Sequence, residues 1–161
     1  MLSFDVVSRL NFQEIDNAIS NALREIGNRY DFKGSNTTIE RSEKQLTIVT
    51  EDELKLKQVH GLIITHLVRR KVDTLCLKIS LKETASGNKI RQVYNLVEGI
   101  EQPIAKKITA NIKNLKLKVN VKINGNELRI DGKKKDDLQN VIQMIKDIKL
   151  DIPVQFVNYR E

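Results

Sequence analysis

The sequence predicts an α+β protein built as a tandem of two ferredoxin-like, or ribonucleoprotein-like (RNP-like), βαββαβ domains. Apolar residues recur with the helical period in some segments and alternate with polar residues in others. The order strand, helix, strand, strand, helix, strand occurs twice along the 161 residues. This order commonly folds as a four-stranded antiparallel sheet with two helices on one face, and polar outward residues require the other face to be open.

The first predicted domain spans residues 1–81. A short strand at Phe4–Val7 precedes a helix with Asn11 as N-cap, and Glu14 completes a capping box. A second capping box, formed by Thr50 with Glu53, is expected to start the next helix. The remaining strand, strand, helix and strand are predicted at 37–41, 45–50, 52–70 and 75–79.

Residues 82–89 contain the small polar segment KETASGN and are the predicted linker. The second domain, 90–161, repeats the element order, and Pro103 falls in the first turn of its first helix, where proline is tolerated. Its elements are predicted at 91–97, 99–115, 117–123, 127–131, 136–148 and 154–159. An alternative stays open: the short first strand can pair with the C-terminal strand of the other half, which would make the domains discontinuous.

The most informative stretch is the hairpin within Leu115–Leu138. Strict alternation places Lys118 and Lys122 outward on the first strand and Arg129 outward on the second. Asn124-Gly125 is typical of a two-residue turn. Lys133, Lys134 and Lys135 follow at a predicted helix start, where backbone N–H groups attract phosphate. The alternative is that these cations are a solvated turn and a solubilising sheet face.

Two further candidate sites lie in the first half. In Arg29–Gly34, Tyr30 or Phe32 can stack on a base while Arg29 or Lys33 contacts phosphate. The alternative is that both aromatic rings pack inward. Arg70 ends a helix, where a cation also complements the negative end of the helix dipole.

Composition bounds the function. The net charge is +7, and residues 1–80 carry 12 Lys+Arg and 11 Asp+Glu, against 16 and 10 in residues 81–161. This basic excess favours a polyanionic partner.

The single cysteine, Cys76, suits a reducing cytoplasm. No apolar run reaches the ~20 residues of a membrane span and no signal peptide is evident, so we expect a cytoplasmic protein without a membrane partner.

Catalytic signatures are missing from the sequence. There is no GxxxxGK[ST], GxGxxG, HExxH, GxSxG or cysteine cluster, so we expect no enzyme activity and no cofactor. Aromatic residues make up 4% of the chain and tryptophan is absent. A sheet with so few rings can attract phosphates but offers little to read bases, unlike sequence-specific RNA readers.

Five segments together resemble the YajQ family of bacterial proteins. They are SFDVVS (3–8), RYDFKG (29–34), KLKV (116–119), GKKKDDLQ (132–139) and PVQFVNYR (153–160). The resemblance implies tandem RNP-like domains and a cytoplasmic, non-enzymatic nucleotide-binding protein. Some relatives are described as cyclic di-GMP effectors acting with a transcription factor, and others as binding GTP, ATP or tRNA. Where the family usually has Lys-Arg-Gly after the second helix, this chain has Arg69-Arg70-Lys71.

Three functional hypotheses follow. In the first, the chain binds a nucleotide, with cyclic di-GMP ahead of GTP and ATP, through cations near the junction of the domains, and acts through a transcription regulator. In the second, it binds tRNA backbone through a basic sheet face. In the third, its basic face meets an acidic protein.

Overall fold

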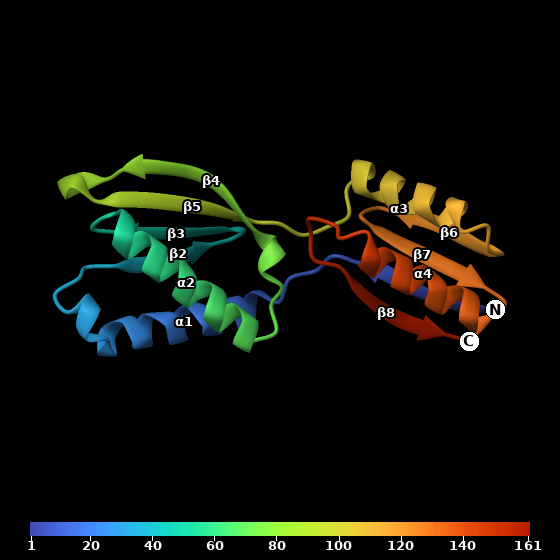
Figure 1. Ribbon diagram of the computed structural model, residues 1–161, viewed down its shortest axis with the longest axis horizontal. Coiled ribbons are helices and arrows are strands. Elements are labelled where there is room, and N and C mark those ends of the chain that lie inside the picture. The colour runs from blue at the N-terminus through green and yellow to red at the C-terminus, as the bar shows by residue number, and fades with distance from the viewer. The chain divides into compact units, whose positions relative to one another are not determined.

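The computed structural model describes residues 1–161 as two compact units (Figure 1). We call residues 10–97 the central domain, and residues 1–9 with 98–161 the split domain. Each contains a four-stranded antiparallel sheet and two helices, which confirms the predicted α+β class.

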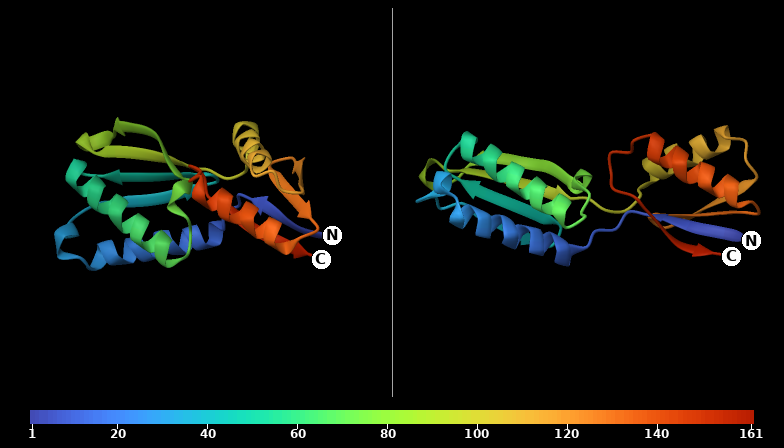
Figure 2. Two further views of the ribbon diagram at one scale, coloured as in Figure 1. Left: turned by 45° about the vertical axis from the view of Figure 1, so that its right-hand side comes forward. Right: turned by 60° about the horizontal axis from the view of Figure 1, so that its bottom comes forward.

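The split domain has the strand order β6-β7-β1-β8. In order of position within the domain, this is the second, third, first and fourth strand, the arrangement of a ferredoxin-like sheet. The views in Figures 1 and 2 show its two helices on one face of the sheet. Its elements are β1 (Leu2–Val7), α3 (Gln102–Asn114), β6 (Val119–Asn124), β7 (Glu127–Gly132), α4 (Lys135–Asp147) and β8 (Gln155–Arg160).

The central domain has the order β2-β3-β5-β4, with α1 and α2 packed together over the sheet. Short 3-10 turns at Tyr30–Phe32, Thr74–Cys76 and Ser86–Asn88 connect its elements. Those elements are α1 (Phe12–Asn28), β2 (Thr38–Ser42), β3 (Gln45–Thr50), α2 (Glu53–Arg69), β4 (Leu77–Thr84) and β5 (Ile90–Leu96).

The domain boundaries differ from the sequential ones predicted at 1–81 and 90–161. Strand β1 leads directly into α1 of the central domain, yet it pairs with β7 and β8, with Phe4 opposite Ile130. Strand β5 leads into α3 of the split domain, yet it pairs with β3 and β4. The two domains thus exchange a strand, and β1 joins the C-terminal strand as in the alternative arrangement.

The segment predicted as a linker, 82–89, is part of a hairpin. Strand β4 continues to Thr84, and after the turn at Ser86–Asn88 the chain returns as β5, with Lys82 opposite Gln92. Small polar residues are typical of linkers and of hairpin turns alike, so composition did not distinguish the two.

One of the two predicted helix caps is correct. The Asn11 side chain accepts from the backbone N–H of Glu14 at 3.2 Å. Thr50 does not cap α2, because it ends β3, is buried and shares a 2.8 Å hydrogen bond with the Thr37 hydroxyl. Asp52 caps α2 instead, accepting from the Lys55 N–H at 2.8 Å.

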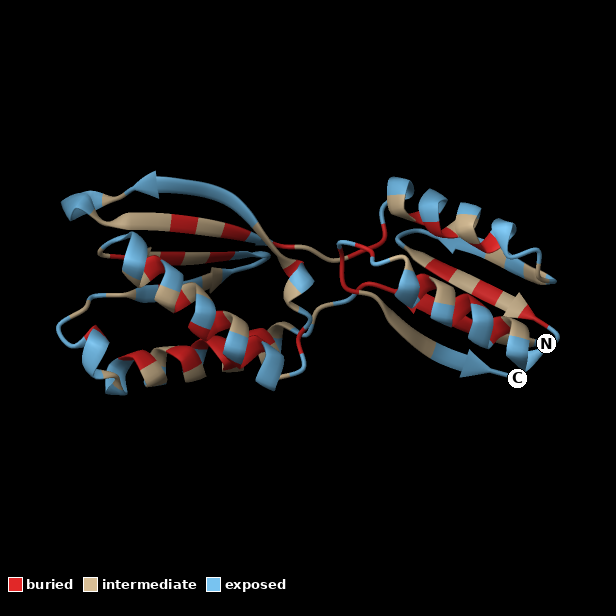
Figure 3. Ribbon diagram, in the orientation of Figure 1, coloured by how far each residue is buried: buried red, intermediate tan, exposed pale blue.

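Burial follows the predicted alternation in β7, and the turn before it lies at Gly125-Asn126 instead of the predicted Asn124-Gly125. In β7, Leu128 and Ile130 are buried under the helices, whereas Arg129 lies on the open face. Figure 3 shows this alternation in β7 and shows the edge strand β6 as mostly exposed. The side chains of Lys118 and Lys122 are accordingly exposed.

Candidate functional site

Three of the predicted lysines surround one cavity, which we call the basic pocket. Its volume is about 390 Å³, and it lies where the start of β6 meets the loop between β7 and α4. Its polar lining consists of Lys118, Asn120, Lys133, Lys134 and Asp137, and Met1 closes one side. The hairpin therefore gathers positive charge at a concave spot.

Local structure explains why these side chains meet. The β6–β7 register places Gly132 opposite Val119, which brings the loop after β7 to the start of β6. A Cβ atom at Gly132 would come within 3.1 Å of Val119 Cγ1 and 3.3 Å of the Lys118 carbonyl oxygen. Glycine at this position thus permits the close approach of the two chain segments.

Helix α4 adds backbone donors to the basic pocket. Its N-cap residue is Lys134, which makes no side-chain capping hydrogen bond. The first backbone N–H groups of a helix have no intrahelical acceptor, and they favour an anion in that position. Asp136 and Asp137 in the first turn offset part of this positive potential.

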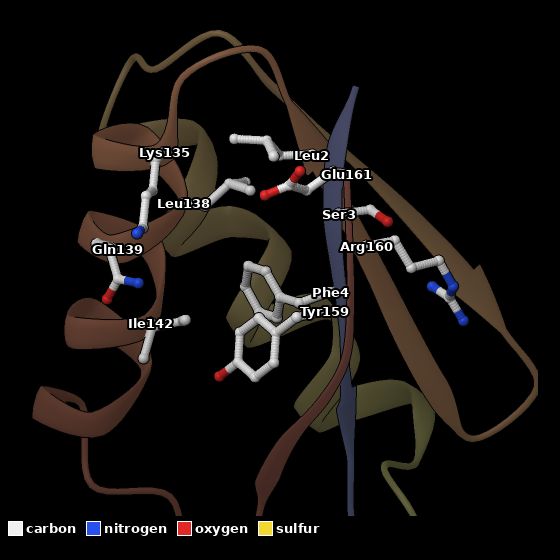
Figure 4. A pocket seen from close by; sticks show the side chains of 10 residues that line it. All are labelled: Leu2, Ser3, Phe4, Lys135, Leu138, Gln139, Ile142, Tyr159, Arg160 and Glu161. Carbon is white, nitrogen blue, oxygen red and sulfur yellow. The ribbon is translucent and has the colours of Figure 1, made fainter.

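A second cavity, the aromatic pocket, has a volume of about 370 Å³ (Figure 4). It is lined on one side by Phe4 and Tyr159 and on the other by Leu138 and Ile142 of α4, with Lys135 at its rim. Residues that are adjacent in the sequence line different cavities. Lys134 and Asp137 belong to the basic pocket, whereas Lys135 and Leu138 belong to the aromatic pocket. The first turn of α4 therefore borders both.

The open face of the same sheet is less basic than predicted, because a carboxylate lies at its centre. Asp5 is 6% exposed and accepts from Arg129 Nε at 3.1 Å, from Asn158 Nδ2 at 2.8 Å and from Arg160 Nη2 at 3.4 Å. Burial raises the pKa of Asp5, but these hydrogen bonds outweigh burial and hold the pKa below its ordinary value. Lys122 lies opposite Arg129.

The candidate residues of the Arg29–Gly34 segment all lie in the central domain. Arg29 is paired with Asp31 at 2.8 Å and with Glu25 at 3.3 Å. Phe32 is 4% exposed and belongs to the hydrophobic core, so the prediction that it stacks on a ligand is wrong. Tyr30, in contrast, is 87% exposed and Lys33 is exposed.

Arg70 also belongs to the central domain, where it lies 3.6 Å from a carboxylate oxygen of Glu14. Of the predicted residues, the structure thus brings together Lys118, Lys133 and Lys134, with Lys135 on the other side of the same helical turn. Lys122 and Arg129 share the open sheet face.

Sequence reasoning missed Tyr159 and its stacking partner Phe4. Alternation in a regular strand places Phe156 and Tyr159, three residues apart, on opposite faces. Both rings nevertheless contact Phe4. The signal for this irregularity was Asn158, a residue type that tolerates the left-handed backbone conformation.

Positive charge is divided almost evenly once the observed boundaries are used. The split domain has 14 Lys+Arg and 10 Asp+Glu, and the central domain has 14 and 11. The asymmetry between the two halves of the sequence was a consequence of the wrong boundary. What distinguishes the split domain is therefore the placement of its lysines, and not their number.

The structure offers little support for a metal site or a reactive cysteine. No group of three or more His, Cys, Asp or Glu side chains is placed to hold a metal ion. Cys76 is buried, and burial raises the pKa of its thiol to about 11, which disfavours the reactive thiolate. No helix has the length and apolar character needed to span a membrane.

Comparison with known proteins gives a consistent result over the whole chain. The family model described as "Nucleotide-binding protein YajQ-like" matches residues 2–160. A nucleotide-binding protein of Pelagibacter ubique is 55% identical over 161 residues, covering all of both chains. Another from Rhodospirillum centenum is 47% identical over the same length, and one from Bacillus cytotoxicus is 46% identical over 98% of this chain and 97% of its own.

Proposed function

Because the chain belongs to the family of YajQ-like nucleotide-binding proteins, we propose that it binds the phosphates of a nucleotide in the basic pocket. Cyclic di-GMP is the lead ligand, and GTP and ATP are its competitors. In this proposal the chain acts by binding and not by catalysis, and it transmits the bound state to a transcription regulator in the cytoplasm.

One observation carries the proposal: Lys118, Lys133 and Lys134 line a single cavity beside the uncapped N-terminus of α4. Ammonium groups act as point charges toward phosphate, and the helix N-terminus adds oriented N–H donors. The 13 residues of α4 form a helix long enough for a dipole effect in its first turn. Asp137 reduces the net positive charge of this lining but leaves it cationic.

Calorimetry with cyclic di-GMP, GTP and ATP tests the proposal. We expect binding by the native chain, and a loss of at least tenfold in affinity for the double variant Lys133→Glu, Lys134→Glu. The matched control is Lys106→Glu, Lys107→Glu, which makes the same charge change at exposed positions of α3 in the same domain. Equal losses in both variants, or no heat at ligand concentrations up to ~1 mM, would contradict the proposal.

The effector role needs a separate measurement. If the chain signals through a regulator, its affinity for that protein should depend on cyclic di-GMP, by the reciprocity that links two binding sites. The regulator is to be captured with the native chain in the presence of nuclease, and its affinity measured with and without the nucleotide. An affinity that is the same in both conditions argues against an effector.

The alternative function is binding of tRNA backbone through the open sheet face. It is favoured by Lys122 lying directly opposite Arg129, with Arg160 on the same face. It predicts an affinity for tRNA that falls steeply with salt, as counterion release requires, and that is lost in Lys118→Glu, Lys122→Glu. The carboxylates on this face, Asp5 and Asp131, weaken the case relative to the basic pocket.

A further inference from the structure

We infer that the aromatic pocket is a nucleobase subsite, in which Tyr159 stacks on one face of a purine ring. As a part of a nucleotide site, this subsite rests on the proposed function of the basic pocket. The inference itself depends on four residues, Phe4, Leu138, Ile142 and Tyr159, none of which belongs to the lysine cluster.

A β-bulge places Tyr159 in this position. Strand β8 pairs Val157 with Asp5 but Arg160 with Ser3, so the register shifts by one residue between these pairs. Without the shift, Tyr159 would point to the open face together with Val157. With it, Tyr159 lies on the helix-covered side beside Phe4, whereas Arg160 and Ser3 point to the other side (Figure 4).

The bulge is held in a conformation that few residues adopt. Asn158 has φ +57°, in the left-handed region, and its side chain donates to Asp5 at 2.8 Å. Bulges re-aim side chains and occur frequently beside functional sites, and left-handed non-glycine residues cluster there as well. Here the re-aimed side chain is a tyrosine at the edge of a cavity.

The Tyr159 ring has one supported face and one open face. Its centroid lies 6.1 Å from that of Phe4, with an angle of 30° between the ring planes, and Phe4 is fully buried. Tyr159 itself remains 64% exposed. An aromatic ring that is packed against a buried ring and still accessible to solvent can stack on another flat ring.

The other walls fit a purine and not a purely apolar ligand. Leu138 and Ile142 face Tyr159 from α4, and Gln139 and Lys135 from the same helix supply an amide and an ammonium group (Figure 4). An amide carries both donors and an acceptor, as recognition of a base edge requires. The first turn of α4 borders both cavities, so this inference places the base of a nucleotide on one side of that turn and its phosphates on the other.

Nucleosides, which lack phosphate, and tripolyphosphate, which lacks a base, test the subsite on the full chain. Guanosine and adenosine, titrated in an NMR experiment, should shift the side-chain resonances of Tyr159, Leu138 and Ile142. Inorganic tripolyphosphate should instead shift the backbone resonances of Lys133 and Lys134. Nucleoside shifts that avoid the aromatic pocket would overturn the inference even if tripolyphosphate binds as expected.

Variants give the second readout. Tyr159→Ala should weaken GTP about tenfold, as loss of a base–aromatic stack does, and leave tripolyphosphate unchanged. Tyr159→Phe should bind GTP like the native chain, and Ile79→Ala, which removes an exposed apolar side chain of the central domain, is the control. Should Tyr159→Ala fail to fold, the nucleoside titration of the native chain still tests whether the aromatic pocket binds a base.

The outcomes separate the two proposals. If Tyr159→Ala binds GTP like the native chain while the lysine variant does not, the base subsite is wrong and the phosphate site stands. If guanosine shifts the aromatic pocket but tripolyphosphate and GTP do not bind near the lysines, the phosphate site is wrong and the base subsite stands.

Discussion

Arg129 Nε donates to Asp5 Oδ1 at 3.1 Å, across the two central strands of the split domain's sheet. Asp5 is among the most buried charged residues of the chain, and it also receives hydrogen bonds from Asn158 and Arg160 on β8. One carboxylate thus connects three strands. It holds the bulge that positions Tyr159, and it lowers the positive charge of a face that the sequence suggested to be basic.

We expect Asp5→Asn to destabilise the protein by about 2 kcal/mol, because a buried acceptor of charged hydrogen bonds is replaced by a neutral group with one fewer acceptor. Urea denaturation measures the change. Asp131→Asn is the control, since Asp131 is less buried and accepts from Asn120 at 2.9 Å, and it should cost less than about 1 kcal/mol. Equal effects of the two substitutions would count against the central role of Asp5.

The same carboxylate predicts a dependence of stability on pH. The pKa of Asp5 is lowered from an ordinary value of 3.8, so its ionised form stabilises the folded state. This contribution is complete above the unfolded-state pKa and is lost as the pH falls through the lower, folded-state pKa. The difference in unfolding free energy between the native chain and Asp5→Asn should therefore be constant from pH 5 to 8 and shrink below about pH 4.

Gly132→Ala should destabilise the split domain by about 1–3 kcal/mol, because the new methyl group comes within 3.3 Å of the backbone oxygen of Lys118, which has little freedom to move. Gly61→Ala is the matched control. It lies inside α2 with no atom within 4 Å of the new Cβ, and it should stabilise the chain by about 1 kcal/mol. A thermal or urea melt of each variant distinguishes the signs, and stabilisation by both would show that the strand end adjusts freely.

Substitutions at Asn158 test the bulge itself. Asn158→Gly keeps the positive φ accessible and loses only the hydrogen bond to Asp5, so we expect a cost of about 1 kcal/mol. Asn158→Val adds the steric penalty of a left-handed β-branched residue, and should cost at least about 1 kcal/mol more. The Tyr159 ring resonances should remain native in the glycine variant and move in the valine variant. A valine variant as stable as the glycine variant would exclude backbone strain at this position.

Much of the fold could be predicted from local patterns. Alternation identified the β6–β7 hairpin and its inward residues Leu128 and Ile130, and Asn11 was correctly expected to cap α1. The gathering of Lys118 with Lys133 and Lys134 was only partly predictable, because the two-residue turn lies at Gly125-Asn126 and not at the predicted Asn124-Gly125, and the observed register pairs Asn124 with Glu127. These features depend on residues close to one another in the chain.

By itself, the sequence determined whether most segments form a helix or a strand and which face they bury, because apolar periodicity is a pattern of residues close together in the chain. Only the tertiary structure decided that β1 and β5 exchange domains, that Asp5 neutralises Arg129, and that Tyr159 turns toward Phe4. A stripe of apolar residues predicts that one face of a strand is buried, but it does not identify the helices that pack on that face. The choice of partner depends on contacts between residues more than a hundred positions apart, and those exist only once the chain has folded.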